Sequence, residues 1–312
     1  RGEIELLKSA FDSIRNMTGV PIVGVLPYII DLRLPDEDSV SLENIKASKT
    51  RPVRISVIRF PRISNFTDFE PLQTHPLVDL VYTSSEEDLV GSDMVILPGT
   101  KNTIGDLKWL RDLGMDAVIQ HLCTQGIPIV GICGGYQMLG KTIFDDEGIE
   151  SESASRVNGL NLLDTETYFE SYQKVTELVS AVPVGSGPIL DNARTDELSG
   201  YEIHMGKTRL GSKAKPAFRI VRRRGMTVSD LDGAVDETGL VFGTYLHGLF
   251  DKSTLRESIV HYLASAKGLR TEQKRTSVES EWEANLERIV NAFEKNMDVD
   301  WIVNLTGLNR TR

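Results

Sequence analysis

The sequence predicts an α/β protein with a mostly parallel sheet that is covered by helices on both faces. From Val53 onward, four short apolar runs alternate with helical stretches; they read RISVIRF, LVDLVYT, DMVILPG and IPIVGIC. Strands that alternate with helices are typical of parallel sheets buried on both sides. The length of 312 residues, with 40% hydrophobic and 26% charged residues, indicates a globular chain with one main domain and an appended piece.

The two ends of the chain differ from this alternating pattern. Residues 3–17 have the apolar spacing of a helix, Gly19 ends that pattern, and the strand-like PIVGVLP follows. One helix and one strand cannot bury each other's apolar faces, so we expect residues 1–50 to be the tail of a larger domain followed by a linker. Residues 51–268 are then expected to form the main domain, and residues 269–312 a helical C-terminal extension.

Within the main domain, one helix is expected between the third and fourth apolar runs, with Gly126 as its C-cap. Cys123 lies in this helix and is expected to be a buried packing residue, because the sequence shows no activating neighbour. Beyond residue 155 the pattern changes to strands with hairpin signals. The basic run RRRG at residues 222–225 is expected at an exposed hairpin tip rather than at an anion site.

Charge and cysteine content exclude several classes of protein. The formal net charge of −10 and the pI near 5.1 give no positive field that would attract a phosphate backbone, so no nucleic acid partner is expected. No apolar run approaches the roughly 20 residues that cross a bilayer, so no membrane contact is expected. Two cysteines, Cys123 and Cys133, cannot form a disulfide framework for a chain this long, which favours a reducing, cytoplasmic setting. No metal or cofactor is expected in this chain itself.

The clearest functional signal is GICGGYQ at residues 131–137, which follows an apolar strand and leads into a helix. A strand, a cysteine, a sharp turn and a helix form a nucleophile elbow, in which Gly131 and Gly135 must lack Cβ atoms so that chain segments can approach. We therefore predict Cys133 as a nucleophile, with its thiolate favoured by the amide groups and dipole of the following helix. The short motif alone leaves a packing role open, because a glycine-flanked buried cysteine also suits a strand end.

A tetrahedral intermediate on Cys133 would need hydrogen-bond donors for its oxyanion. The amide of Gly134 is one expected donor, because this residue follows the nucleophile directly. Gly99 is the other, because LPGTKNT at residues 97–103 ends the preceding strand, where a neighbouring loop would lie.

A thiolate that attacks an amide needs a base that later protonates the leaving ammonia, and histidine can do both near neutral pH. Of the five histidines, His247 is the predicted partner, because it follows the strand-like LVFGTYL and is flanked by Gly248. Glu202 and His204 alternate along GYEIHMG and so share one face of a strand. Whether they line the site or form a structural pair stays open. Structural or surface roles are expected for the remaining histidines, His75, His121 and His261.

Extended to GxCxGxQ, the motif resembles that of class I glutamine amidotransferases, which implies that Gln137 and Gly135 help to hold glutamine. Six segments in order, among them PRISNFTDFEPL, LPGTKNTIGDLKWLR, YEIHMG and GTYLHGLFD, resemble the C-terminal portion of the cobyric acid synthase family and span residues 25–251. The resemblance implies a flavodoxin-like class I amidotransferase fold, with Cys133 as nucleophile and His247 as its partner.

In that family an ATP-binding domain related to dethiobiotin synthetase precedes the amidotransferase domain, and residues 1–50 resemble its end. ATP and Mg²⁺ are therefore expected for the full-length enzyme, whereas no phosphate-binding loop is expected in this chain. The implied partners are glutamine and a corrinoid, adenosylcobyrinic acid a,c-diamide, whose b, d, e and g carboxylates would be amidated to give adenosylcobyric acid.

One position departs from the wider class I pattern. Typical members carry a glutamate two residues beyond the histidine, but Leu249 stands there in this chain, so an acid from elsewhere is expected and Glu202 is one candidate. Three rival interpretations are another amidotransferase such as cobyrinic acid a,c-diamide synthase, a binding module with a vestigial site, and a cysteine hydrolase. The intact Cys133 and His247 weigh against the second, and Gln137 would have no evident purpose in the third.

Overall fold

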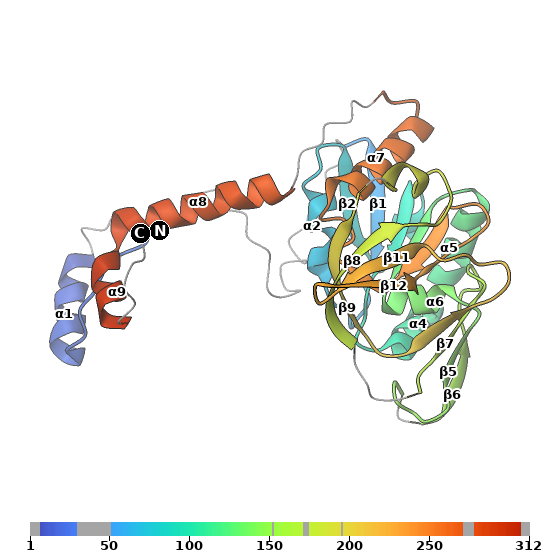
Figure 1. Ribbon diagram of the computed structural model, residues 1–312, viewed down its shortest axis with the longest axis horizontal. Coiled ribbons are helices and arrows are strands. Elements are labelled where there is room, and N and C mark those ends of the chain that lie inside the picture. The colour runs from blue at the N-terminus through green and yellow to red at the C-terminus, as the bar shows by residue number, and fades with distance from the viewer. Residues whose placement is uncertain are drawn as a thin grey trace. The chain divides into compact units, whose positions relative to one another are not determined.

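The computed structural model describes residues 7–29, 51–151, 153–170, 175–194, 196–270 and 278–306. Contacts within the chain divide it into two compact units (Figure 1). The larger unit comprises residues 36–277, and the smaller one combines residues 1–35 with residues 278–312. Every candidate site residue lies in the larger unit.

A six-stranded sheet forms the centre of the larger unit, with the strand order β13-β14-β4-β3-β1-β2. All its pairings are parallel except that of the edge strand β13, which is antiparallel to β14. In chain order the bounds of these strands are Val53–Ile58 (β1), Val78–Thr83 (β2), Met94–Leu97 (β3), Ile129–Ile132 (β4), Ala234–Val235 (β13) and Val241–Thr244 (β14). The predicted mostly parallel sheet is confirmed, and the four apolar runs are its strands β1 to β4.

Both faces of this sheet are buried. Helices α4 (Thr103–Asp112) and α5 (Met115–Thr124) pack on one face, where Leu107 belongs to a buried apolar cluster with strand residues. Helix α7 (Ser253–Ala266) packs on the other face, where Ile259 belongs to a second cluster that also includes residues of an antiparallel sheet. The prediction of helices on both faces is therefore confirmed, with the addition of a sheet on the second face.

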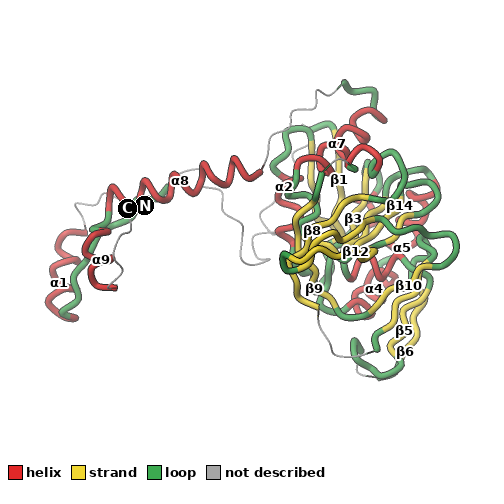
Figure 2. The backbone as a smooth tube through the Cα atoms, in the orientation of Figure 1, coloured by secondary structure: helices red, strands yellow, loops and turns green. Residues whose placement is uncertain are grey.

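Two smaller sheets complete the described part of the larger unit (Figure 2). One has the order β10-β7-β5-β6, and the other is antiparallel throughout with the order β12-β11-β8-β9-β15. The expected hairpin is confirmed, because β11 and β12 are joined through Arg224 and Gly225, whose φ angles are 50° and 79°. The exposure expected of the whole run is not, because Arg223 lies within β11 and its half-buried side chain pairs with Glu177 and Glu202. The bounds are Thr142–Asp145 (β5), Ser155–Asn158 (β6), Thr165–Tyr168 (β7), Val175–Pro183 (β8), Leu198–His204 (β9), Lys207–Leu210 (β10), Phe218–Arg223 (β11), Met226–Asp232 (β12) and Leu246–His247 (β15).

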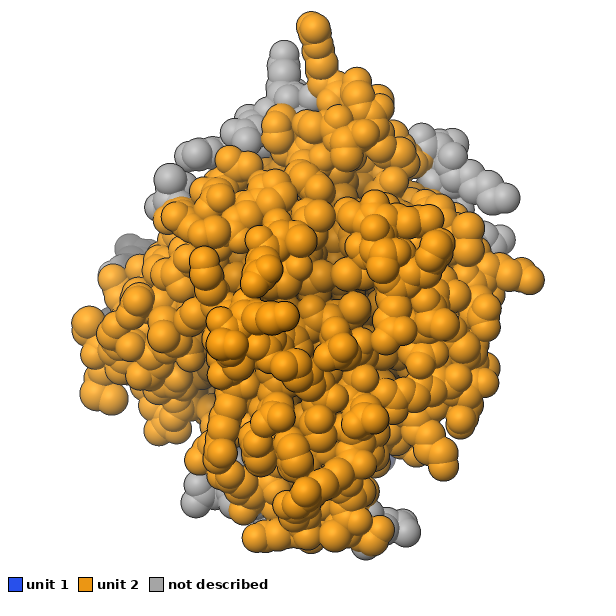
Figure 3. All heavy atoms as spheres, turned by 90° about the vertical axis from the view of Figure 1, so that its right-hand side faces the viewer, with its two compact units in different colours: residues 1–35, 278–312 blue, residues 36–277 orange. Residues whose placement is uncertain are grey.

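Short helical elements connect these strands. They are the 3-10 helices η3 (Phe66–Phe69) and η4 (Asp191–Ala193) and the helices α2 (Glu70–Gln73), α3 (Glu86–Leu89) and α6 (Gly134–Leu139). Figure 3 shows one face of the larger unit, whose residues are orange.

Two expected elements differ from the structure. The single helix expected between β3 and β4 is two helices, because the chain breaks at Gly114, which has a φ of 70° and precedes α5. The strand expected at PIVGVLP was wrong, since the segment makes one isolated bridge, between Gly24 and Met297. Apolar spacing shows neither a one-residue break nor the absence of a neighbouring strand.

The smaller unit joins both ends of the chain. It contains α1 (Lys8–Thr18), which ends at Gly19 as expected, together with α8 (Val278–Asn296) and α9 (Val299–Thr306). The Val25 amide donates to the Asn296 carbonyl at 3.2 Å, and the Asp298 amide donates to the Val23 carbonyl at 2.7 Å. The domain boundaries predicted at residues 50 and 268 stay predictions. The sequence analysis did not predict that residues 23–25 pair with residues 296–298. Among the described residues, no helix has the length and apolar character that a membrane span needs.

Candidate active site

Cys133 lies at a sharp turn between strand β4 and helix α6. Its backbone has φ 52° and ψ −110°, a conformation that costs a residue with a side chain about 1–3 kcal/mol. A Cβ atom on Gly131 would lie 2.7 Å from the Tyr136 amide nitrogen, and one on Gly135 would overlap the Leu97 carbonyl oxygen. The steric reason given for both glycines is therefore seen in the structure, which has the geometry of a nucleophile elbow.

Main-chain pairing brings His247 to this elbow. The Cys133 amide donates to the Thr244 carbonyl at 2.8 Å, and His247 follows three residues later in β15. The imidazole is fully buried, and its Nε2 has no hydrogen-bond partner in the described part of the chain. The neighbouring Cys133 thiol is close enough to help raise the pKa of His247. The structure thus brings the two predicted catalytic residues together.

The acid that holds His247 is Asp68, which the sequence analysis did not single out. Asp68 lies in η3, and its carboxylate accepts hydrogen bonds from Nδ1 of His247 at 2.6 Å and from the Gly248 amide at 3.0 Å. Only 4% of Asp68 is exposed, so solvent screens this pair weakly. A bond at Nδ1 leaves Nε2 as the nitrogen available to the sulfur and its substrate.

The charge state of His247 follows from this pairing. Burial lowers the pKa of the ring, but the charge and hydrogen bond of Asp68, together with Cys133, outweigh burial and raise the pKa to about 10. His247 is therefore an imidazolium at neutral pH. A cationic ring beside a cysteine is the setting in which thiolates form.

A tyrosine covers the ring of His247. Tyr201 lies opposite His247 in the β9–β15 pair, and their rings stack with centroids 5.1 Å apart and planes 15° apart. The Tyr201 hydroxyl accepts a hydrogen bond of 2.8 Å from Asn65, which precedes the short helix that carries Asp68. Stacking and the Asp68 bond together fix the plane of the imidazole.

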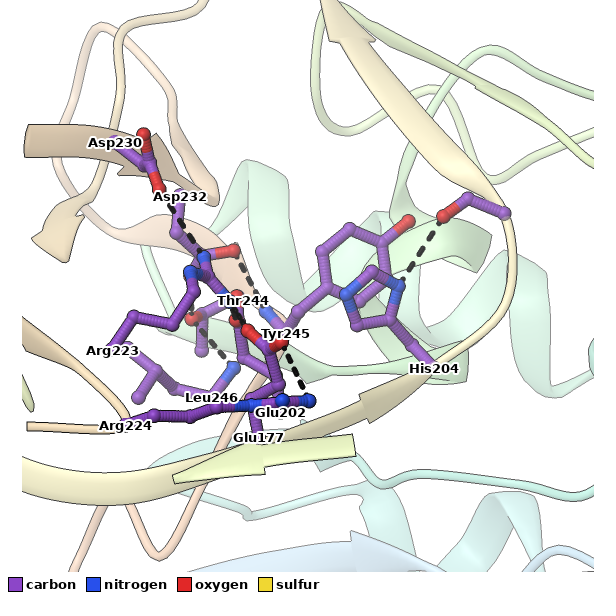
Figure 4. Close-up of polar contacts among 11 residues, drawn as sticks. Glu177, Glu202, His204, Arg223, Arg224, Asp230, Asp232, Thr244, Tyr245 and Leu246 are labelled. Carbon is purple, nitrogen blue, oxygen red and sulfur yellow. Dashed lines mark hydrogen bonds and ion pairs between the residues drawn. The ribbon is translucent and has the colours of Figure 1, made fainter. Parts of the chain in front are cut away.

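Glu202 was one candidate for the missing acid, but the structure pairs it with Arg223 rather than with His247. Figure 4 shows Glu202 turned toward Arg223, to which it is hydrogen-bonded, and Arg223 also bonds Glu177 at 2.7 Å. Asp68 takes the place next to His247 instead. Glu202 therefore belongs to an ion-pair cluster with Arg223 and Glu177.

His204 lies near the site but makes a structural contact. Its ring stacks on Tyr245 with centroids 3.8 Å apart, and Nδ1 bonds the Gly206 carbonyl at 3.3 Å (Figure 4). Burial lowers the pKa of His204 to about 4, so the ring is neutral at physiological pH. Contact of His204 with a substrate stays a prediction.

Each of the two expected oxyanion donors lies close to another residue of the site. A Cβ atom on Gly134 would lie 3.3 Å from the Thr100 amide, and one on Gly99 would lie 3.2 Å from Cε1 of His247. No hydrogen bond in the described part of the chain uses the amides of Gly99 and Gly134. Both amides are thus available beside the nucleophile.

Gln137 has a different setting from the one expected of a substrate ligand. Its side chain is 2% exposed; Oε1 accepts from the Thr103 hydroxyl at 2.8 Å, and Nε2 donates to the Met205 carbonyl at 2.9 Å and the Tyr245 hydroxyl at 3.2 Å. These bonds connect helix α6 to the segments that contain Thr103, Met205 and Tyr245. Direct contact of Gln137 or Gly135 with glutamine stays a prediction.

The phosphate-loop pattern, which was not expected in this chain, does occur in its sequence. The letters GYQMLGKT, from Gly135 to Thr142, do match the phosphate-loop pattern GxxxxGK[ST]. The structure places most of them in α6, where the Gly135 amide donates to Pro98 and the Lys141 amide to Thr165. The Lys141 ammonium is paired with Asp164. Because amides and lysine are already bonded, this segment has no cradle for phosphate.

The described residues contain no group of three or more histidine, cysteine or acidic side chains that could hold a metal ion.

The segments that meet at the site share one property: each follows the carboxyl end of a strand. Residues 59–69 follow β1, residues 98–103 follow β3, and Cys133 and His247 follow β4 and β14. In an open parallel sheet this edge is where ligands bind. That rule could have drawn attention to Asp68.

The fold is the one predicted, that of class I glutamine amidotransferases. The fold is similar to the structure of PurLQS from Thermotoga maritima, with a TM-score of 0.51 and 17% identity, covering 68% of this chain and 99% of that one. At this identity the likeness concerns the fold alone.

The family follows from the sequence comparison. The CobB/CobQ-like glutamine amidotransferase domain matches residues 54–255, and the chain belongs to this family. It is 42% identical over 312 residues to cobyric acid synthase of Moorella thermoacetica and 46% identical over 309 residues to the probable cobyric acid synthase of Methanosarcina acetivorans. These alignments cover 99% of this chain and 60% and 59% of the relatives. The resemblance to the C-terminal portion of cobyric acid synthases is confirmed, and the chain spans about 60% of the length of these curated relatives.

Proposed function

We propose that this chain hydrolyses the side-chain amide of glutamine, with Cys133 as nucleophile, His247 as acid and base, and Asp68 as the acid that orients the ring. The observation that carries the proposal is the 2.6 Å bond between Asp68 and His247 beside a cysteine on a strained elbow. Nucleophile, base and orienting acid in this order form the general arrangement of nucleophilic amide cleavage.

The reaction proceeds in two steps. The Cys133 thiolate adds to the side-chain carbonyl carbon of glutamine, and the His247 imidazolium gives its Nε2 proton to the amide nitrogen, which leaves as ammonia. A glutamyl thioester remains on the sulfur. Neutral His247 then takes a proton from water as the water attacks the thioester, glutamate leaves, and the thiolate–imidazolium pair is restored.

The amides of Gly99 and Gly134 stabilise the oxyanion that forms in both steps. Among the residues that the structure describes, neither amide is used by another hydrogen bond, and both lie beside the elbow. Donors that are already oriented toward the developing charge need no reorganisation during the reaction. A reducing, cytoplasmic compartment would keep the Cys133 thiol in the state that this chemistry needs.

Trapping of the thioester tests the proposal. The chain is incubated with glutamine, quenched in acid and examined by mass spectrometry for a glutamyl adduct, while ammonia release is measured in parallel. Cys133→Ala should lose both signals. Cys123→Ala is the matched control, since Cys123 is half-buried in α5 and burial raises the pKa of its thiol.

The control should keep both the adduct and the ammonia. An unmutated chain that forms no adduct under turnover would count against the mechanism and would favour a binding module. Hydrolysis of peptides or esters in preference to glutamine would favour a cysteine hydrolase instead.

We further propose that ammonia released here is used by the longer protein to amidate the b, d, e and g carboxylates of adenosylcobyrinic acid a,c-diamide. The relatives named cobyric acid synthase support this substrate. The alternative is another carboxylate, such as that used in cobyrinic acid a,c-diamide synthesis. In the full-length protein, Cys133→Ala should abolish amidation with glutamine and retain it with added ammonia, and the corrinoid that is consumed identifies the substrate.

ATP and Mg²⁺ are expected to belong to the remainder of that longer protein. The one phosphate-loop match in this chain has its amides and its Lys141 side chain already bonded, so these residues do not fit a nucleotide. We therefore assign no step of phosphate chemistry to this chain.

A further inference from the structure

Helix α4 contains a buried carboxylate that the proposed mechanism does not use. Asp106 is 0% exposed and accepts hydrogen bonds from the Thr100 hydroxyl, the Arg62 guanidinium at 3.0 Å and the Arg62 amide at 3.3 Å. Burial of a carboxylate is costly unless it is paired and hydrogen-bonded. The partners of Asp106 therefore indicate which parts of the chain it holds.

Those partners belong to two segments that meet at the active site. Ile63 and Thr100 form an antiparallel bridge. On either side of it, the Ser64 amide donates to the Gly99 carbonyl at 2.9 Å and the Lys101 amide donates to the Arg62 carbonyl at 3.0 Å. Asp106 bonds to one member of each segment and thus fastens this short ladder at its side.

Both segments carry parts of the proposed machinery. The segment at residues 62–64 leads into the short helix that holds Asp68, and the segment at 99–101 begins with the oxyanion donor Gly99. Thr100 also touches the other donor, since a Cβ atom on Gly134 would lie 2.6 Å from the Thr100 methyl carbon. The residue held by Asp106 through its hydroxyl therefore follows Gly99 directly in the chain and packs against Gly134.

Resting on the proposed function, we propose that Asp106 is a positioning residue that sets the oxyanion site through Thr100. The amides of Gly99 and Gly134 must both reach the same oxygen within ordinary hydrogen-bond distance. Release of Thr100 lets the Gly99 loop move relative to Gly134, and a displacement near 1 Å costs about 10²-fold in rate. Ground-state binding of glutamine does not depend on this distance in the same way, because the oxyanion exists only after attack.

Variants of the Thr100–Asp106 contact test the proposal. Thr100→Val removes the hydroxyl at constant shape, Thr100→Ser retains it, and Asp106→Asn removes the charge. Ser92→Ala is the matched control, because the Ser92 hydroxyl makes a buried bond of 2.7 Å with Ser56 on β1, outside the described site. Melting temperature, kcat and KM for glutamine are measured for each variant.

A second readout is the affinity for the aldehyde analogue of glutamine. Its carbonyl adds the Cys133 thiol to give a tetrahedral adduct that resembles the intermediate. We expect Thr100→Val and Asp106→Asn to lower kcat by about 10- to 100-fold and to weaken aldehyde binding by a similar factor, with KM little changed. Thr100→Ser should resemble the unmutated chain. Ser92→Ala should lose thermal stability without loss of kcat.

The outcomes separate this inference from the proposed function. If Asp106→Asn does not fold, Thr100→Val against Thr100→Ser decides. Equal kcat and equal aldehyde affinity in those two variants overturn the positioning role while leaving glutamine hydrolysis intact. An unmutated chain that neither hydrolyses glutamine nor binds the aldehyde at Cys133 removes the proposed function, and the inference with it.

Discussion

Asp68→Asn is the sharpest test of the site, because it keeps the shape of the side chain and removes its charge. Asp68 accepts from Nδ1 of His247 at 2.6 Å and from the Gly248 amide at 3.0 Å. Asparagine has one oxygen for these two donors. If the oxygen faces Gly248, the NH₂ group faces Nδ1 and forces the ring proton onto Nε2. If the amide is turned round, two N–H groups face each other at Gly248.

The magnitude follows from those two bonds. A hydrogen bond to a charged group contributes about 1.5–3 kcal/mol, and each ~1.4 kcal/mol is a tenfold change in rate, so its loss alone lowers kcat/KM by about 10- to 100-fold. The wrong tautomer adds to this effect, because Nε2 can then no longer accept a proton. We expect a total fall between about 10²- and 10⁴-fold, the upper end being that of the same exchange in a serine-protease triad.

The pH profile carries a more specific signature. Burial lowers the pKa of His247, and Asp68 and Cys133 overcome this to raise it to about 10. Without the Asp68 charge, the burial contribution is opposed by Cys133 alone, so the pKa of His247 falls from its raised value. The alkaline limb of kcat/KM, where the imidazolium is lost, should move to lower pH by the same amount.

The assay is glutamate release across the range from about pH 6 to about pH 10, which brackets the ordinary and the raised histidine pKa. Glu202→Gln is the comparison variant, because Glu202 is bonded to Arg223 rather than to the ring. Its alkaline limb should stay in place. An unmoved limb in Asp68→Asn, or a moved one in Glu202→Gln alone, would show that the acid has been assigned to the wrong residue.

Three further predictions concern stability. Gly135→Ala places a Cβ atom on a main-chain carbonyl oxygen and should cost about 3 kcal/mol or more, measured by urea unfolding. Arg223→Met leaves the 5%-exposed Glu202 without its cation and should cost about 3 kcal/mol, whereas the double change with Glu202→Gln should recover part of the loss. The pKa of His247 is raised from 6.5 to about 10 in the folded chain, so its pairing with Asp68 stabilises the fold fully below about pH 6.5 and progressively less up to pH 10. The difference in Tm between the unmutated chain and Asp68→Asn should therefore shrink as the pH rises through that window.

Much of the central sheet is predictable from local sequence. Strands buried on both faces are short, nearly continuous apolar runs, and RISVIRF and DMVILPG stand out against the helices between them. The break at Gly114 is harder, because a helix interrupted by one turn keeps its apolar spacing on both sides. The pairing of residues 23–25 with residues 296–298 joins segments more than 250 positions apart, and no pattern within either segment specifies its partner.

The site divides in the same way. Cys133 was predictable because its strained turn demands small neighbours on both sides, which leaves a local signature in the sequence. His247 was predictable from the strand that precedes it. Asp68 has no such signature, since an aspartate in a short 3-10 turn is unremarkable until tertiary contacts bring it to a histidine 179 positions away. Glu202 shares a strand face with His204, but the neighbour that decides its role, Arg223, comes from another strand.

The distance between sulfur and ring is set by two adjacent strands rather than by the long stretch of chain that separates them. The Cys133 amide donates a hydrogen bond to the Thr244 carbonyl, and His247, three residues further on, brings its imidazole to the site. Strands β5 and β6 lie between these points in sequence and take no part in the β4–β14 pairing that sets this distance, although Glu150 in their connection accepts a hydrogen bond from the Thr103 amide. We therefore expect related proteins to differ between Cys133 and Thr244, where contacts to different acceptors can form. The chemistry that produces ammonia should stay the same in them.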